Sequence, residues 1–507
     1  MERVDVLVIG GGIGGAAAAW QAARGGANVL VAEESPWIGG MVSAAGVSAL
    51  DGNEGALGSG FFRAFRTAME HHHGGPDRVR TGWVSNTCFE PHVAARWLSR
   101  ELAAAGVRVV HGARLVETVL QGSAVRGARF ETGTGQFEVR AHVTVEATEY
   151  GDVLLTGGIP HALGREARHD TGEPDAPVIA DMEVQDPTYC AILQRFDGVA
   201  PRVESPAPVD PREFDGCVRE WASHRDEALW NHTLHDWDSF LTYALLPGGK
   251  FLLNWPFHAN DFPADTGLYE PGPARARVLA SARARTLSFV KFIQEELGHA
   301  EWGLAPDEFG TKDLLPHMPY VRESRRAIAL ESVREQDVVP LRGCLRPPLR
   351  ASSIAVGDYF IDHHHSKAHL PPARRLVENY PKNAPFQIPY GALVPREHDG
   401  LLCAEKTFGS THVANGCTRL QPVVMQVGQA AGMAAALCVR RGIEPRALPI
   451  RDLQLALVEA GSMLVPFRDV SCDDAEFARI QRGYALGEIG FGPSTPYLWS
   501  EARGTTR

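Results

Sequence analysis

Three glycines near the start of the chain have the spacing of a phosphate-binding turn. Gly10, Gly12 and Gly15 match G-x-G-x-x-G between an apolar run at residues 4–9 and an alanine-rich run at residues 16–23. In a strand–turn–helix unit, such glycines let backbone N–H groups and the helix N-terminus approach a diphosphate. We therefore expect a dinucleotide to bind the loop residues Gly10, Gly12, Ile13, Gly14 and Gly15.

Two acidic residues close the next predicted strand, residues 28–32. Glu33 stands about 20 positions after Gly15, the spacing expected for a carboxylate that bonds a ribose 2′-hydroxyl. Together, Glu33 and Glu34 repel a 2′-phosphate, which argues against NADP. The alternative to dinucleotide binding is that residues 10–15 form an ordinary glycine-rich turn between a strand and a helix.

A glycine pair after the two acids distinguishes between the remaining dinucleotides, NAD and FAD. Gly39, Gly40 and Met41 follow shortly after the two acids. This pair resembles the flavoproteins of the glutathione-reductase-like class, in which FAD lies extended along the first domain. No second G-x-G-x-x-G follows a predicted strand later in the sequence, so we expect FAD and no separate NAD(P)H domain.

The order of predicted elements supports the same fold. A helix at residues 91–105 and a strand at 107–110 precede three extended segments, at 115–120, 125–131 and 137–140, which indicate an antiparallel meander. Further elements are a buried strand at 143–148, a last strand at 400–404 and a helix at 421–439. We predict an α/β fold with a Rossmann-like FAD-binding domain, built from a parallel sheet and the meander, and an inserted mixed α/β substrate domain.

Composition shifts suggest where these domains begin and end. The predicted FAD-binding domain takes residues 1–156 and 390–442, and the substrate domain takes residues 157–389, where Trp, Pro and His concentrate. Residues 443–507 form a C-terminal tail with one predicted helix near 450–460.

Bulk properties exclude several classes of protein. The 507 residues carry a net charge of −11 and no run rich in Lys or Arg, so we expect no nucleic-acid partner. The longest small and apolar stretch, residues 430–439, is half of a membrane span, and we expect no membrane. The cysteines form no C-x-x-C pair, and because a strand-like run begins at residue 4 we expect no signal peptide. A reduced, cytoplasmic setting is therefore expected, with the oligomeric state left open.

Several longer segments are similar to a known family, the bacterial FAD-dependent oxidoreductases within the glutathione-reductase-like flavoproteins. The similar segments are residues 37–41, 146–152, 322–326, 404–406, 411–412, 419–422 and 428–432, and the chain departs from a common Val-Ala-Glu-Lys pattern at Cys403. This resemblance implies tightly bound FAD and redox chemistry. By family position, Leu115 and Val116 meet adenine, Ala147 and Thr148 run along the dinucleotide, and Arg419, Leu420 and Gln421 meet the isoalloxazine ring.

Histidines are the leading candidates for proton chemistry. His412 precedes the helix expected to face the flavin, so we predict that it is a base or an orienting residue. Its alternative role is a loop histidine bound to backbone.

The run from Asp362 to His365 follows a strand-like segment, on which His363 and His365 share one face and His364 the other. This run lines a substrate pocket, binds a metal or forms a polar edge. Of these alternatives we choose the substrate pocket, with His364 as a catalytic candidate, and we predict no metal ligands.

Two further segments could fix a polar substrate. Asp261, with Asn254, Trp255 and Asn260, combines aromatic surface with hydrogen-bonding groups, although an ordinary loop anchored by Trp255 is the alternative. Arg322 could clamp a carboxylate or the FAD diphosphate. Its neighbours Arg325 and Arg326 are expected to form internal ion pairs with Glu323 and Glu331.

These residues predict a flavin-dependent oxidation. We expect two-electron dehydrogenation of a small polar amine or alcohol by hydride transfer to flavin N5, with O₂ or another electron acceptor reoxidising FAD. The first alternative is a flavin monooxygenase or halogenase acting on a small metabolite, although the G-D-A-A-H and W-x-W-x-I-P segments of such enzymes are missing. The second is a flavin-binding protein with a vestigial or regulatory redox role.

Overall fold

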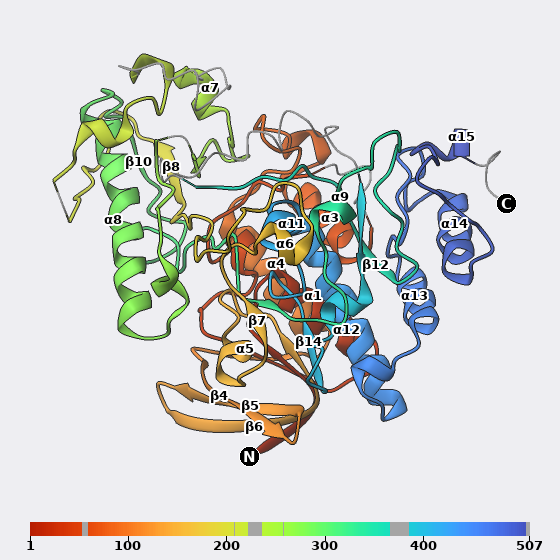
Figure 1. Cartoon of the computed structure of the whole chain (residues 1–507). Helices are drawn as coiled ribbons and strands as arrows, with labels where there is room; N and C mark the ends of the chain where they lie inside the picture. The colour runs from red at the N-terminus through yellow and green to blue at the C-terminus, as the bar shows by residue number, and fades with distance from the viewer. Residues whose placement is uncertain (53–58, 207, 222–235, 257, 366–384, 503–507) are drawn as a thin grey trace.

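The apolar run at the start of the chain forms the centre of a parallel sheet. A computed structural model describes all residues except 53–58, 207, 222–235, 257, 366–384 and 503–507. In it, β1 (Glu2–Ile9) lies between β2 (Val29–Glu33) and β6 (Gly135–Glu146) and is parallel to both. β3 (Arg108–His111) extends the sheet beyond β2, and β14 (Leu401–Cys403) pairs with β6 in parallel. The predicted Rossmann-like sheet is confirmed (Figure 1).

One long strand replaces two that the sequence suggests separately. β6 pairs antiparallel with β5 (Ala124–Thr132) through residues 135–140 and parallel with β1 through residues 139–146. β4 (Arg114–Gln121) completes the antiparallel meander. The predicted strands at 137–140 and 143–148 are therefore a single element. It is continuous because Ala141 and His142 between them include no Gly or Pro to interrupt the ladder.

Two long helices cover β1 and pack directly against each other. α1 (Ile13–Arg24) and α12 (Gln421–Arg441) both contact β1. A Cβ added to Gly428 would lie 2.1 Å from the carbonyl oxygen of Gly14, and one added to Gly432 would lie 2.1 Å from that of Ala18. The small-residue face predicted for this helix therefore brings two backbones into contact. By length and composition α12 could cross a membrane, but 94% of that stretch is buried inside the protein.

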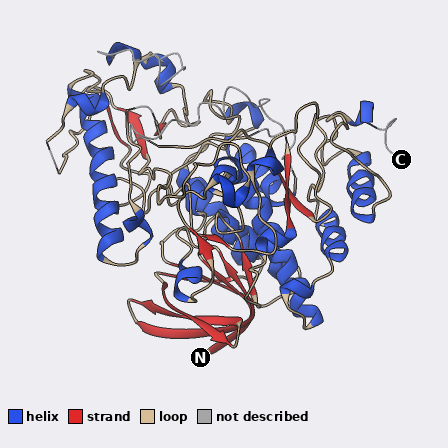
Figure 2. Ribbon diagram, in the orientation of Figure 1, coloured by secondary structure: helices blue, strands red, loops and turns tan. Residues whose placement is uncertain are grey.

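A second hydrophobic core forms within residues 191–315. It contains β8 (Ala191–Arg195), β9 (Phe251–Leu253), β10 (Trp302–Leu304) and one face of α8 (Pro273–Glu295). Figures 1 and 2 show α8 at one side of the molecule, away from the parallel sheet. By contrast, β12 (Ser353–Gly357) contacts α12, where Gln426 Nε2 donates to the Val356 carbonyl oxygen at 3.0 Å. The domain boundaries at residues 157 and 389 remain a prediction.

The C-terminal tail contains more helix than the sequence suggests. Beside the expected α13 (Ile450–Glu459), it forms α14 (Ala475–Leu486) and a short α15 (Trp499–Ala502). Asp474 caps α14 by accepting a hydrogen bond from Glu476 N, and Phe477 and Ile480 of α14 are buried in the main core. The remaining α-helices and strands of the described residues are α3 (Gly60–His73), α4 (Pro91–Ala104), α5 (Asp152–Thr156), β7 (His161–Ala162), α6 (Arg168–Thr171), α7 (Trp237–Leu241), β11 (Arg326–Ala327), α9 (Glu335–Val338), β13 (Phe386–Pro389) and α11 (His412–Thr418).

The contact between α1 and α12 predicts a large stability effect at one glycine. Gly432→Val forces a side chain against the Ala18 carbonyl group, so the helices must separate, and we expect the free energy of unfolding to fall by about 2 kcal/mol or more. Urea denaturation measures this change. Arg440→Ala, at the exposed end of the same helix, should stay within about 0.5 kcal/mol of the wild type. An equally stable Gly432→Val variant would contradict the close packing.

Candidate active site

The glycine loop between β1 and α1 leaves space only for hydrogen at its key positions. A Cβ on Gly10 would lie 2.2 Å from the Ala147 carbonyl oxygen, and one on Gly15 would lie 2.1 Å from the Gly10 carbonyl oxygen. A Cβ on Gly12 would lie 2.3 Å from Glu405 Oε1. The loop therefore meets the turn after β6, where the sequence predicts Ala147 and Thr148 to lie. This close approach is what the glycine spacing requires of a dinucleotide-binding turn.

Glu33 stands at the carboxyl end of β2 and faces the loop. Its carboxylate accepts hydrogen bonds from Gly11 N and, at 2.6 Å, from Ser35 N. Burial raises its pKa to about 7, although both hydrogen bonds oppose the shift. Glu34 beside it is exposed. The Ala113 backbone N–H donates to the Glu33 carbonyl oxygen at 3.0 Å, which brings the start of β4 to this edge two residues before Leu115 and Val116.

The second glycine pair lies against the first loop. Gly39 N donates to the Gly11 carbonyl oxygen at 2.7 Å, and Gly40 begins the short 3-10 helix η1 (Gly40–Val42), in which Met41 is buried. Gly39 and Gly40 have φ values of 116° and 48°, which favour glycine. A Cβ on Gly40 would lie 2.7 Å from Glu149 Oε1, a buried oxygen with no hydrogen-bond partner among the described residues.

A buried lysine between two acids, Glu149 and Glu405, completes this region. Glu405 and Lys406 were not predicted as site residues from the sequence. Gly14 N, in the first turn of α1, donates to Glu405 Oε1 at 2.5 Å. Lys406 Nζ lies 2.5 Å from Glu149 Oε2 and 3.4 Å from Glu405 Oε2. Burial raises the pKa of Glu405 to about 7, while Lys406 opposes the shift. The carboxyl group of Glu405 thus lies at the amino end of α1, where the helix dipole favours negative charge. The motif around residues 404–406 was the available signal.

Three of the four predicted catalytic side chains contact one another. His364 Nδ1 lies 2.6 Å from Asp261 Oδ2, and Arg322 Nη2 lies 3.1 Å from Asp261 Oδ1. The other ring nitrogen of His364 lies 3.1 Å from Asp362 Oδ2. Burial would raise the pKa of Asp261, but Arg322 and His364 outweigh it and lower that pKa. Burial and Arg322 would lower the pKa of His364, but its two carboxylate neighbours raise it.

This charged cluster reaches the amino end of α12. Arg419 Nη2 lies 2.9 Å from Asp362 Oδ2, and Arg419 Nη1 donates to Tyr320 Oη at 2.5 Å. Leu420 is the N-cap residue of α12, and Gln421 Nε2 donates to the Ala49 carbonyl oxygen at 3.5 Å. Among the described residues, Arg322 Nε, Arg419 Nε and Gln421 Oε1 are buried without a hydrogen-bond partner. These are the polar atoms that a ligand could satisfy.

Asp51 joins this cluster and was not predicted. Its Oδ1 is buried and has no hydrogen-bond partner within the described part of the chain. Burial raises the pKa of Asp51 to about 7, with Arg419 opposing and Asp362 adding to the shift. His364 and Arg322 also act on its charge. The only signal in the sequence was an acid after the apolar residues 47–50, and many loops share it.

His412, the fourth predicted residue, belongs to a neighbouring cluster. Its Nδ1 lies 3.0 Å from both oxygens of Glu323, and its Nε2 lies 3.3 Å from His365 Nε2. Gln185 links the two clusters, because its backbone N–H donates to Glu323 at 3.1 Å and its Oε1 accepts from His364 N at 3.4 Å. The histidine run is not a strand, yet His363 and His365 still face His412 while His364 turns away.

Other candidates from the sequence have structural partners. Asn260 Oδ1 accepts from Trp255 N at 3.0 Å, and Trp255 Nε1 donates to the Cys217 carbonyl oxygen at 2.9 Å, so both hold their own loop. Arg326 pairs with Glu323 and Glu166 as an internal ion pair. The prediction that Glu331 forms an ion pair with Arg325 or Arg326 is wrong. Glu331 accepts hydrogen bonds from Ser352 Oγ and Gly391 N instead.

Comparison with solved structures finds distant matches. A geranylgeranyl bacteriochlorophyll reductase-like protein from Thermoplasma acidophilum is 12% identical, with 96% of this chain and 88% of that chain covered and a TM-score of 0.39. A myxobacterial chondrochloren halogenase is 18% identical, with 41% and 47% covered and a TM-score of 0.24. An anhydrotetracycline hydroxylase from Streptomyces rimosus is 17% identical, with 40% and 39% covered and a TM-score of 0.26. The chain spans less than half the length of the last two.

The chain was also compared with curated protein sequences and with protein families. The curated sequences contain no match. The FAD dependent oxidoreductase family matches residues 5–457, which include the glycine loop, the charged cluster and α12. The chain therefore belongs to the FAD dependent oxidoreductase family and is an enzyme whose cofactor is FAD.

Proposed function

We propose that this enzyme removes two electrons from a small polar amine or alcohol. The observation that carries the proposal is the buried cluster of Asp51, Asp261, Arg322, His364 and Arg419, which retains unpartnered polar atoms beside the amino end of α12. Such a cluster suits a small molecule with a polar head, because buried donors and acceptors without partners are costly. O₂ or another acceptor would complete the turnover.

We further propose that FAD binds along the edge of the sheet that holds the glycines. Gly10 to Gly15 and the amino end of α1 would hold the diphosphate, Glu33 the ribose, and the Gly39–Gly40 pair and Glu149 the next part of the cofactor. Arg419, Leu420 and Gln421 would adjoin the ring. The hydrogen bond from Gly14 N to Glu405 Oε1 supports this assignment, because it makes this helix end a donor to an acidic group. When bound, FAD supplies the two-electron acceptor.

Within the cluster, the side chains that several neighbours hold in place would orient the substrate. Arg322 is fixed by Asp261 and by the Asp186 carbonyl oxygen, which its Nη1 contacts at 2.6 Å. His364 is fixed between two carboxylates. Because these side chains are immobilised before a ligand arrives, little conformational entropy is lost when they bind one. Arg322 would therefore fix the polar head of the substrate through its unpartnered Nε, and Asp261 and His364 would hold Arg322 in position.

Asp51 is the proton acceptor in this proposal. Oxidation of an amine or alcohol removes a proton from the N–H or O–H group as the C–H bond breaks. Asp51 Oδ1 has no competing partner among the described residues, and its pKa of about 7 suits a base at neutral pH. His412 then acts as an orienting residue, because both of its ring nitrogens already face Glu323 and His365.

A side chain added to the tightly packed glycine loop should remove the cofactor. Gly12→Val adds a side chain where Glu405 Oε1 would be only 2.3 Å away, so we expect colourless protein. Flavin content is measured by absorbance after denaturation, and circular dichroism checks folding. Gly133→Val, at a turn with open space around it, should keep full flavin content. A folded, fully yellow Gly12→Val variant would contradict the assignment of the loop.

The proposed reaction predicts which reductants bleach the flavin. Under anaerobic conditions, one or more small polar amines or alcohols should reduce the bound FAD, while NADH and NADPH should not, because no second dinucleotide motif follows. Stopped-flow absorbance records the bleaching. Reduction by NAD(P)H alone, followed by an oxygenated product in air, would replace the proposal with a monooxygenase. No reduction by any compound of a broad panel would leave only a redox-inactive flavoprotein.

The role of Asp51 predicts a pH dependence of the reductive step. The carboxylate is the active form and its raised pKa is about 7, so the rate of flavin reduction should rise with pH and level off above about 7. Asp51→Asn should lower this rate by about 100-fold or more and abolish the rising limb while keeping the flavin. Asp197→Asn, at an exposed position, serves as the matched control. An unchanged profile in Asp51→Asn would remove Asp51 from the mechanism.

A further inference from the structure

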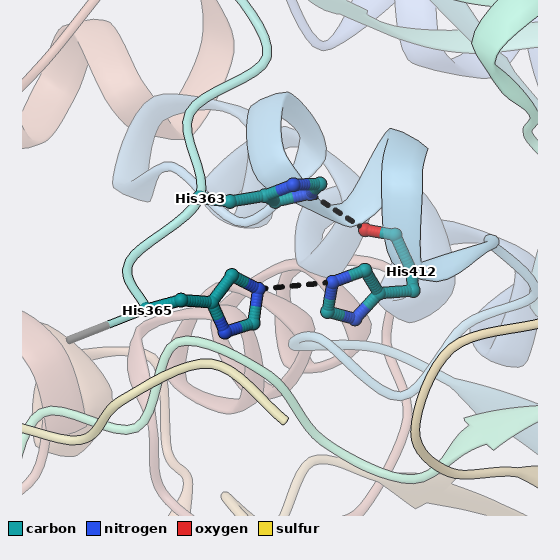
Figure 3. Close-up of side chains that lie close together, drawn as sticks. All are labelled: His363, His365 and His412. Carbon is teal, nitrogen blue, oxygen red and sulfur yellow. Dashed lines mark hydrogen bonds between the residues drawn. The ribbon is translucent and has the colours of Figure 1, made fainter. Parts of the chain in front are cut away.

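Three imidazoles from two segments face one another beside the proposed substrate cluster. His363 and His365 follow β12 along the chain, and His412 is the first residue of α11. One ligand atom from each lies within 4.8 Å of the other two. Figure 3 shows the His365 and His412 rings side by side with the His363 ring above them. Their centroids are 4.6 Å apart for His363 and His412 and 5.4 Å apart for His365 and His412.

The surroundings of His412 prepare its Nε2 as a ligand. A carboxylate can only accept here, so Nδ1 of His412 donates to Glu323 and leaves the lone pair on Nε2. Glu323 is fully buried and is itself held by Arg326 and by Gln185 N. A carboxylate behind a histidine is the usual arrangement that fixes the tautomer and ring of a metal-binding imidazole.

The distance between two of the nitrogens fits a tetrahedral ion. His365 Nε2 and His412 Nε2 are 3.3 Å apart. With metal–nitrogen bonds of about 2.0–2.1 Å, two ligand nitrogens of a regular tetrahedron stand about 3.3–3.4 Å apart. An ion can therefore replace the hydrogen bond between these rings without moving either side chain far. The proton of that hydrogen bond then passes from His365 Nε2 to its Nδ1.

His363 supplies the third imidazole. Its Nε2 lies 2.9 Å from the His412 carbonyl oxygen and 3.1 Å from the Val413 carbonyl oxygen, so this nitrogen donates and Nδ1 keeps the lone pair. Coordination requires the ring to turn about its side-chain bonds.

We propose that His363, His365 and His412 bind a divalent transition metal ion of the Zn²⁺ type. Glu323 is the positioning residue behind His412, and water or a small ligand would complete the coordination. Three imidazoles with an open position suit Zn²⁺ and its first-row neighbours rather than Mg²⁺ or Ca²⁺, which prefer oxygen ligands. The proposal goes beyond the flavin reaction and does not depend on its substrate.

Zn²⁺ binding to the holoenzyme tests the site. The protein is treated with a chelator, dialysed against Zn²⁺ and assayed for metal content and by calorimetry. We expect one Zn²⁺ per chain in the wild type and a dissociation constant at least about 100-fold higher in His365→Ala, because a ligand contributes at least as much as a residue behind it. His365 is chosen because its one direct hydrogen bond among the described residues is to His412, so the fold should survive. Flavin absorbance and the unfolding midpoint check this.

A second variant and a control make the result specific. Glu323→Gln should raise the dissociation constant by about 10–100-fold, as expected for a positioning carboxylate. His72→Ala changes an exposed histidine of α3 and should leave the affinity unchanged. No Zn²⁺ uptake by the wild type, or equal uptake by His365→Ala, would overturn the proposal. Loss of binding in His72→Ala alone would assign the metal to α3 instead and overturn it as well.

Discussion

The contact between the backbones of α1 and α12 is the constraint on which the rest of the structure depends. Gly14 faces Gly428 and Ala18 faces Gly432 at distances that exclude any larger side chain. Since the two helices begin at residues 13 and 421, this contact brings together the glycine loop and the segment of Arg419 to Gln421, which are far apart in the sequence. Two helix amino ends, where backbone N–H groups lack partners within the helix, thus lie at the same side of the sheet.

The buried charges next to these helix ends follow from the same arrangement. Glu149, Glu405 and Lys406 form one network near α1, and Asp261, Asp362, Arg322, His364 and Arg419 form another near α12. Buried ions are costly unless they are paired, and here most of them are. Among the described residues, Asp51 Oδ1 and Arg419 Nε stay unpaired beside the second network, which is why we propose that the substrate binds there.

Local patterns in the sequence predicted the parallel sheet and the glycine loop well. Strand, turn and helix signals near Gly10 to Gly15 depend on neighbouring residues, and the structure confirms them. The small residues of α12 likewise indicated a close helix contact. The continuous β6 was read as two strands because the alternation of buried and exposed positions changes where its partner changes from β5 to β14. That change is a tertiary effect which no local pattern records.

The substrate side was harder to predict for a physical reason. The contact between His364 and Asp261 spans about a hundred residues of sequence, and the contact between His412 and Glu323 spans nearly as many. Such pairs become visible only when the chain is folded. The residue types suggested His412, His364, Asp261 and Arg322, but they did not separate them into two clusters. They gave no reason to select Asp51, and only the motif at residues 404–406 pointed to Glu405.

A crystal structure of the purified yellow protein tests the central claim most directly. The account predicts that FAD lies with its diphosphate at the backbone of Gly12 to Gly15 and its ring beside Arg419 to Gln421, next to Asp51. Electron density for the cofactor at another place, or a ring remote from the charged cluster, would contradict it.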